Sequence, residues 1–264
     1  MDTVESADGT AIAYERSGSG PPLVLVHGSG ATDHRRWEIG GVRPALAEHS
    51  TVYAIDRRGR GESGDATEYA FEREVADVLA VLDVIDEPVT LLGHSFGANI
   101  ALKVSVRTDD LAALILYEPA IPTGDHEFSN QAAVDEINSF IDDGMNEQAV
   151  VVFEREIGGL TSAEIEVFRS DPSWEDRVAA AHTLPREEAA IATFSFDPDR
   201  FATMTAPTVL MTGGDSPPLY SDATKAVANA LPNSRIVTFE GEKHVAMNNR
   251  PDRFVDEVLA ATAR

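Results

Sequence analysis

Residues 88–104 read PVTLLGHSFGANIALKV and combine an apolar run, a G-x-S-x-G pattern and a helical pattern. The apolar run before Gly93 predicts a buried strand, and the apolar spacing after Gly97 predicts a helix. A serine on the sharp turn between them, here Ser95, is exposed above the sheet, and the flanking glycines allow the strained turn. The N–H group of Phe96 then lies at a helix N-terminus, where it can face developing negative charge. The stretch therefore predicts a nucleophilic serine.

The rest of the chain alternates short apolar strands with helical patterns, which is typical of a mostly parallel α/β sheet flanked by helices. We expect an edge strand at residues 10–15 and further strands at 23–26, 51–55, 88–92, 111–117, 207–211 and 235–239. We expect helices at residues 67–85, at 223–231 and from about 251. Residues 122–201 show only amphipathic helical patterns. The sequence thus predicts a core domain of residues 1–121 and 202–264 with a helical insertion at 122–201.

Composition restricts the classes of function. The chain has 264 residues, of which 43% are hydrophobic, and it has no cysteine, so disulfides and thiolate chemistry are excluded. No apolar stretch approaches the roughly 20 residues that span a bilayer, and the acidic N-terminus lacks a signal core, so we expect a cytoplasmic protein. The net charge of −24 repels phosphate groups, so neither nucleic acid nor an anionic membrane is an expected partner. The same charge suggests the hypothesis of a salt-loving source, while the oligomeric state is not predicted.

A serine hydroxyl becomes a good nucleophile only when a base removes its proton. Among the seven histidines, only His244 follows the last predicted strand and lies in a loop before the final helix. Such a loop lets a side chain reach over the sheet to the nucleophile of a neighbouring strand. We therefore expect His244 to be the general base, and His27 and His94 to be structural.

Four motifs occur at strand ends in a specific order: HGSG at 27–30, DRRGRGES at 56–63, GHSFG at 93–97 and GEKH at 241–244. With these motifs the chain resembles the α/β-hydrolase superfamily over essentially its whole length. The resemblance implies the α/β-hydrolase fold with an inserted helical cap, Ser95 as nucleophile and His244 as base. It also implies an oxyanion hole from the backbone N–H groups of Ser29 and Phe96, and a structural role for Asp56.

The acid of the triad has two candidates. In this superfamily it usually follows the strand after the insertion, three residues beyond a glycine; counted from Gly213, that position holds Ser216, and the nearest carboxylate is Asp215. Haloalkane dehalogenases instead place the acid at the end of the strand after the nucleophile helix, where this chain has Glu118. Glu118 needs no shift of register, but either carboxylate would fix the histidine tautomer and stabilise the imidazolium. Both Glu118 and Asp215 are kept as candidates.

These residues predict a cofactor-independent serine hydrolase that acts on a small or medium carboxylic ester through an acyl-enzyme. A serine at the elbow disfavours haloalkane dehalogenase and epoxide hydrolase chemistry, where the resemblance would demand aspartate. Alternatives are a cofactor-free haloperoxidase, a carbon–carbon bond hydrolase, or a slow or non-catalytic ligand-binding sensor on the same fold. No residue cluster has metal-ligand spacing, so we expect no metal and no cofactor, only a small-molecule substrate. Aromatic residues of the insertion either line a substrate pocket or pack its helices: Phe128, Phe140, Phe153, Phe168, Trp174, Phe194 and Phe196.

Overall fold

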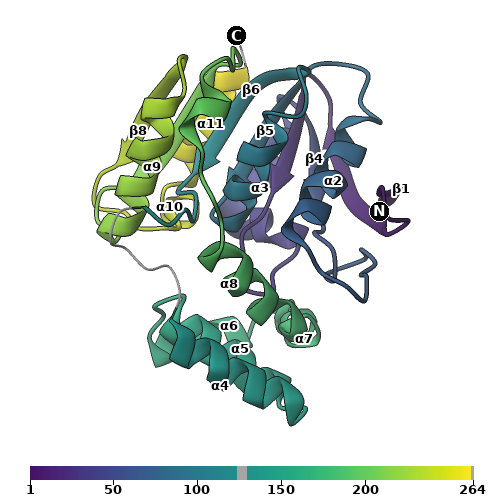
Figure 1. Cartoon of the computed structure of the whole chain (residues 1–264), viewed down its shortest axis with the longest axis vertical. Helices are drawn as coiled ribbons and strands as arrows, with labels where there is room; N and C mark the ends of the chain where they lie inside the picture. The colour runs from purple at the N-terminus through teal and green to yellow at the C-terminus, as the bar shows by residue number, and fades with distance from the viewer. Residues whose placement is uncertain (124–129, 263–264) are drawn as a thin grey trace.

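The computed structural model describes residues 1–123 and 130–262, and its centre is an eight-stranded sheet (Figure 1). The strands lie in the order β1-β2-β4-β3-β5-β6-β7-β8; β2 pairs antiparallel with β1 and β4, and all other pairs are parallel. The strands span Asp2–Glu5 (β1), Ala11–Gly18 (β2), Pro22–Val26 (β3), Thr51–Ile55 (β4), Val89–His94 (β5), Leu111–Tyr117 (β6), Thr208–Gly213 (β7) and Ser234–Phe239 (β8). The predicted mostly parallel sheet is confirmed.

Helices cover both faces of the sheet, which explains why every residue of β3, β4 and β5 is buried. One face packs against α2 (Phe71–Leu82), α3 (Phe96–Val104) and α9 (Pro218–Ala230). The other face packs against α1 (Val42–Ala47) and α11 (Pro251–Thr262). Two further elements contribute to this layer, the 3-10 helix η1 (His34–Gly41) and α10 (Ala246–Asn249).

A run of helices connects β6 to β7, and Figure 1 shows α4 to α7 below the sheet, with α8 between them and the sheet. The helices are α4 (Gln131–Asp142), α5 (Asn146–Glu156), α6 (Ser162–Arg169), α7 (Trp174–Ala179), η2 (Ala181–Thr183), α8 (Leu184–Ala192) and η3 (Pro198–Phe201). They enclose a small apolar core of their own, built around Ile137, Val150 and Trp174. We call residues 122–201 the inserted segment; its described part contains no strand, as the sequence pattern predicts.

The structure corrects the expected elements in three places. Residues 10–15 do not form an edge strand, because β1 pairs outside β2. The sequence did not predict β1, since the acidic residues Asp2 and Glu5 disfavour strands. The helix expected at 67–85 is confined to α2, and α9 begins at Pro218 rather than at Ala223, because proline is well tolerated in the first turn of a helix. Within the described residues, no helix is long and apolar enough to cross a membrane.

Candidate active site

Ser95 lies on the turn from β5 into α3, with φ 55° and ψ −120°. A non-glycine residue with positive φ is strained, and such strain is typical of functional sites. The backbone of this turn passes so close to β3 that only glycine fits at position 97. A Cβ atom on Gly97 would lie 2.3 Å from the carbonyl oxygen of Val26. The glycines of the G-x-S-x-G pattern therefore do what the sequence pattern predicts, and they hold the serine in a fixed position at the end of β5.

The loop after β3 packs directly against Ser95, since a Cβ atom on Gly28 would lie 3.0 Å from Ser95 Cβ. Ala31 in the same loop has a positive φ of 53°. The backbone N–H groups of Ser29 and Phe96 donate no hydrogen bond to another described residue. Backbone N–H groups without a partner near a nucleophilic serine can bind an oxyanion.

The acidic partner at this site is Glu118, which follows β6 with a positive φ of 44°. Its Oε2 atom lies 2.6 Å from Nδ1 of His244. Its Oε1 atom accepts hydrogen bonds from Thr212 Oγ1 at 2.8 Å and from the Gly213 N–H at 2.7 Å. Burial alone would raise the pKa of the Glu118 carboxyl. His244 first, and then the Ser216 side chain and the Gly213 N–H, outweigh burial and hold the pKa below its usual value. The carboxylate is therefore charged and fixed in orientation.

His244 lies near the end of the loop between β8 and α10 and contacts two aromatic rings. The ring of Tyr220 stacks on it at a centroid distance of 4.1 Å, and the ring of His94 lies 4.7 Å away. His94 Nε2 donates to the His244 carbonyl at 2.9 Å, and Tyr117 Oη donates to the Lys243 carbonyl at 2.7 Å. Because His94 precedes the nucleophile, this bond ties the base loop to the elbow. No hydrogen bond joins Ser95 to His244 in this structure.

The second candidate acid lies elsewhere. Asp215 is exposed, its N–H donates to the Glu242 carbonyl at 2.9 Å, and no described residue forms an ion pair with it. The structure thus brings Glu118 to His244 and leaves Asp215 in solvent. Sequence spacing left the two open because both carboxylates follow parallel strands that end at the same edge of the sheet.

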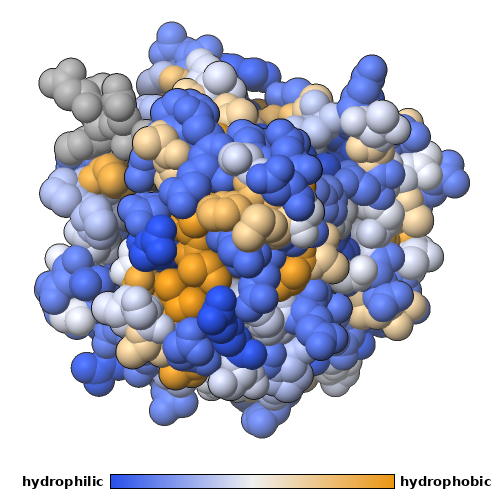
Figure 2. Space-filling model, turned by 90° about the horizontal axis from the view of Figure 1, so that it is seen from below, coloured by the Kyte–Doolittle hydropathy of each residue, from blue (hydrophilic) through white to orange (hydrophobic). Residues whose placement is uncertain are grey.

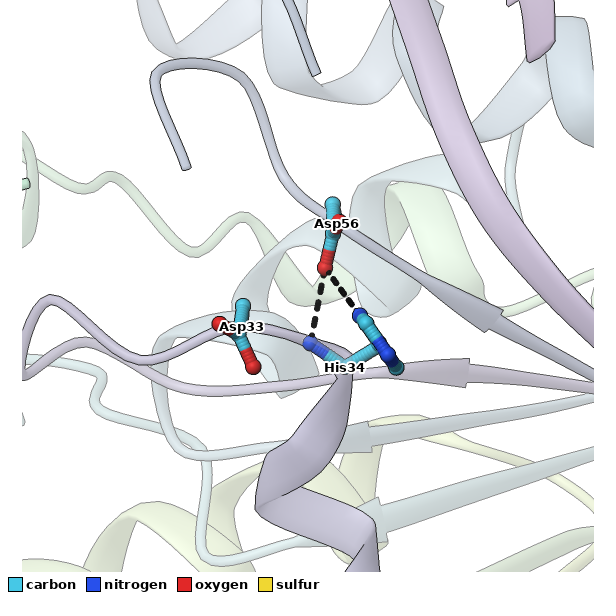
Figure 3. A group of neighbouring side chains, drawn as sticks. All are labelled: Asp33, His34 and Asp56. Atoms are coloured by element: carbon cyan, nitrogen blue, oxygen red, sulfur yellow. Dashed lines mark hydrogen bonds and ion pairs between the residues drawn. The ribbon is translucent and has the colours of Figure 1, made fainter. Parts of the chain in front are cut away.

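The described residues contain one group whose spacing could hold a metal ion, formed by Asp33, His34 and Asp56 (Figure 3). The Asp56 carboxylate already accepts from the backbone N–H and the Nδ1 of His34 and from the Glu62 N–H, at 2.7 to 2.9 Å. The Asp33 carboxylate is occupied by Arg35. Because the oxygens of both carboxylates already accept hydrogen bonds, we interpret the group as a hydrogen-bond network that fixes the turn at residues 56–63.

A buried network of charges joins the inserted segment to the core, and sequence reasoning missed it. Arg57 pairs with Glu74 of α2 at 2.6 Å and with Glu187 of α8, and Arg60 pairs with the same Glu187 oxygen at 2.5 Å. The guanidinium of Arg57 also lies 4.6 Å from the ring centre of Phe96. The sequence signal was the set of three arginines in the DRRGRGES motif, and the partners of Arg57 and Arg60 are distant in the chain.

The aromatic residues of the inserted segment mostly pack its helices. Phe153 and Trp174 belong to the core of that segment, with Phe140 and Phe168 against it, while Phe194 and Phe196 pack on the sheet domain. The ring of Phe153 also reaches the loop after β3, where it lies 3.3 Å from the place of a Cβ atom on Gly30. Phe128 lies outside the described residues.

This geometry agrees with the comparison to known proteins. A model of the alpha/beta hydrolase family matches residues 23–257. The chain belongs to the alpha/beta hydrolase family. The match includes the elbow, the loop after β3, Glu118 and His244, so the expected superfamily, fold class and hydrolase activity are confirmed.

Relatives of this hydrolase include enzymes of more than one specificity. An alpha/beta hydrolase from Sphaerobacter thermophilus is 33% identical, with 98% of this chain and 100% of the other covered and a TM-score of 0.82. An esterase from Rhodococcus sp. is 25% identical, with 99% and 98% covered and a TM-score of 0.79. A 2-hydroxy-6-oxo-6-(2'-aminophenyl)hexa-2,4-dienoic acid hydrolase from Metapseudomonas resinovorans is 23% identical over 98% of this chain and 90% of the other.

Proposed function

We propose that this hydrolase cleaves a small or medium carboxylic ester through an acyl-enzyme at Ser95, with His244 as general base and Glu118 as the acid. The observation that carries the proposal is the 2.6 Å pair of Glu118 and His244 beside a strained serine. A charged carboxylate on Nδ1 leaves Nε2 of His244 free of a proton, so that this atom can accept the serine proton.

The reaction then proceeds in two halves. His244 Nε2 takes the proton of Ser95 Oγ as Oγ attacks the ester carbonyl, and the N–H groups of Ser29 and Phe96 stabilise the oxyanion. The intermediate collapses, the carbon–oxygen bond breaks, and His244 returns the proton to the leaving alcohol. A water molecule, deprotonated by His244, attacks the acyl-enzyme, and Ser95 leaves with its proton restored. Glu118 remains ionised throughout and stabilises the imidazolium.

We further propose that the inserted segment, residues 122–201, is a cap over this site. Arg177 of α7 donates to the Gly30 carbonyl at 3.1 Å, and Glu187 of α8 pairs with Arg57 and Arg60. Figure 2, the view from the side of this segment, shows apolar side chains near the middle of a mostly hydrophilic face. Such a cap excludes water from the acyl-enzyme and favours apolar acyl groups of limited size.

The test is hydrolysis of p-nitrophenyl esters of increasing acyl length by the wild type and by Ser95→Ala. We expect turnover with an optimum at short or medium chains and a loss of about 10⁴-fold or more in kcat for the variant. Trapping of the acyl-enzyme, observed as a mass increase on the peptide that contains Ser95, would locate the intermediate. Turnover that survives in a folded Ser95→Ala protein would reject the mechanism.

Carbon–carbon bond cleavage is a second candidate, because the relative from Metapseudomonas resinovorans is named for a dienoic acid substrate. The same serine, base and oxyanion hole can hydrolyse an activated ketone. The decisive comparison is kcat/KM for that dienoic acid against kcat/KM for the best ester. A larger value for the dienoic acid would replace the ester proposal.

A further inference from the structure

Glu188 of α8 stands on the apolar side of its helix. Leu184 and Ile191, one turn before and one turn after it, are both buried and lie on the same face. Leu184 packs in the apolar cluster that contains Ala31 of the loop after β3, and Ile191 packs in the cluster that contains Phe96. Glu188 therefore lies on α8 between a residue of the cluster that includes the loop after β3 and a residue of the cluster that includes the nucleophile turn.

The Glu188 residue is 2% exposed, and its carboxyl group has no hydrogen bond or ion pair with any described residue. The buried arginines close to α8, Arg57 and Arg60, both pair with its neighbour Glu187. Buried polar groups in proteins are nearly always hydrogen-bonded, since an unpaired one costs free energy. A carboxyl group left without a partner at this position therefore requires an explanation.

Glu188 is linked to the catalytic base through Tyr220. Its charge is among the causes that raise the pKa of Tyr220, the residue whose ring stacks on His244. Burial, reinforced by the charge of Glu187, raises the pKa of Glu188 itself to about 8. At neutral pH the group thus carries its proton and presents an O–H donor instead of a negative charge.

We propose that Glu188 donates a hydrogen bond to the substrate, and that the substrate carries an uncharged carbonyl oxygen in addition to the ester group under attack. This inference rests on the proposed function and specifies the substrate class of the same site. A site that provides a buried donor discriminates against analogues without the acceptor, because the donor is then left unpaired.

The experiment uses two pairs of esters that differ only by a carbonyl oxygen in place of a methylene group. The first pair is p-nitrophenyl 4-oxopentanoate and p-nitrophenyl pentanoate, with the acceptor on the acyl side. The second is 3-oxobutyl butyrate and butyl butyrate, with the acceptor on the alcohol side and hydrolysis followed by proton release. Each pair is measured with the wild type, with Glu188→Gln, which keeps a donor, and with Glu188→Met, which has none.

We expect the wild type to prefer the keto ester of one pair by about tenfold in kcat/KM, the effect of one hydrogen bond. Glu188→Met should lose this preference, so that its kcat/KM values for the two esters of a pair become equal within about twofold, and Glu188→Gln should retain most of the preference. The pair that shows the effect identifies the side of the substrate that carries the acceptor. Equal preferences in wild type and Glu188→Met for both pairs would overturn the inference alone. Absence of hydrolysis that depends on Ser95 for every ester would instead overturn the proposed function.

Discussion

Two glutamates at the same end of the molecule, Glu118 at the end of β6 and Glu188 in α8, are almost equally inaccessible, at 0% and 2% exposed. Glu118 accepts hydrogen bonds from three groups, and its pKa is held below the usual value in spite of burial. Glu188 has no partner among the described residues, and burial raises its pKa to about 8. The comparison shows that burial alone does not decide the charge of a carboxyl group; the donors around it do. The core has a fixed anion, and the inserted segment has a neutral donor.

The largest expected effect is the loss of the anion. Glu118→Gln keeps the shape of the side chain but presents no charge to the imidazolium and can select the wrong His244 tautomer. We expect kcat for the best p-nitrophenyl ester to fall by about 10³–10⁴-fold with little change in KM. The matched control is Asp215→Asn, for which we expect a change of less than about threefold.

The outcome for this pair of variants decides the acid. A large loss in Asp215→Asn together with a small one in Glu118→Gln would show that the loop after β7 rearranges to supply the acid. Melting temperatures of both variants separate a lost charge from a lost fold, because Glu118 also anchors Thr212 and Gly213.

The second prediction concerns the neutral carboxyl and the pH dependence of stability. The pKa of Glu188 is about 8 in the folded state, against an ordinary value of 4.5. Between these values the folded state binds more protons than the unfolded state, so this group makes the protein less stable as pH rises. Relative to Glu188→Gln, the wild type should lose about 3 kcal/mol of unfolding free energy between pH 5 and pH 8. Urea unfolding of both proteins at several pH values gives this difference. Parallel pH profiles would mean that Glu188 is charged in the folded protein.

The sequence identified Glu118 as a candidate but did not identify Glu188. Strand-end motifs located Ser95, His244 and the strand that ends at Glu118, because the carboxyl ends of parallel strands meet at one edge of a sheet. The choice between Glu118 and Asp215 depends on backbone geometry at positive φ, which spacing does not reveal. Glu188 was missed entirely. The sequence does not show which of the adjacent residues Glu187 and Glu188 has a charged partner. Only the fold places Arg57 and Arg60 against Glu187.

A smaller effect is expected when the acid of the triad is moved from position 118 to position 216, where the superfamily usually has it. The Ser216 side chain is among the groups that lower the pKa of Glu118, so the two side chains are neighbours. In the double variant Glu118→Gln with Ser216→Asp, a carboxylate can reach His244 from the loop after β7. We expect kcat to recover about tenfold over Glu118→Gln. Ser216→Asn in the same background, which has the shape without the charge, should give no recovery. Equal rates in the two double variants would mean that His244 accepts an acid only from β6.

The smallest expected effect is the dependence of the melting temperature on salt, which should involve the carboxyl groups on the surface and not the buried ones. We propose that the net charge of −24 reflects adaptation to high salt, since the Debye length falls to about 3 Å at 1 M and surface repulsion is then screened. The melting temperature should rise by about 2–4 °C or more between low and molar KCl, corresponding to about 1 kcal/mol. At pH 7 the difference between wild type and Glu188→Gln should remain unchanged across the same range, because a protonated Glu188 carries no charge for salt to screen. An equal rise in isosmolar sucrose would assign the effect to excluded solute. A melting temperature that does not increase with KCl would refute the adaptation, while a salt-dependent Glu188 difference would show that solvent ions reach α8 and that its carboxyl is not enclosed.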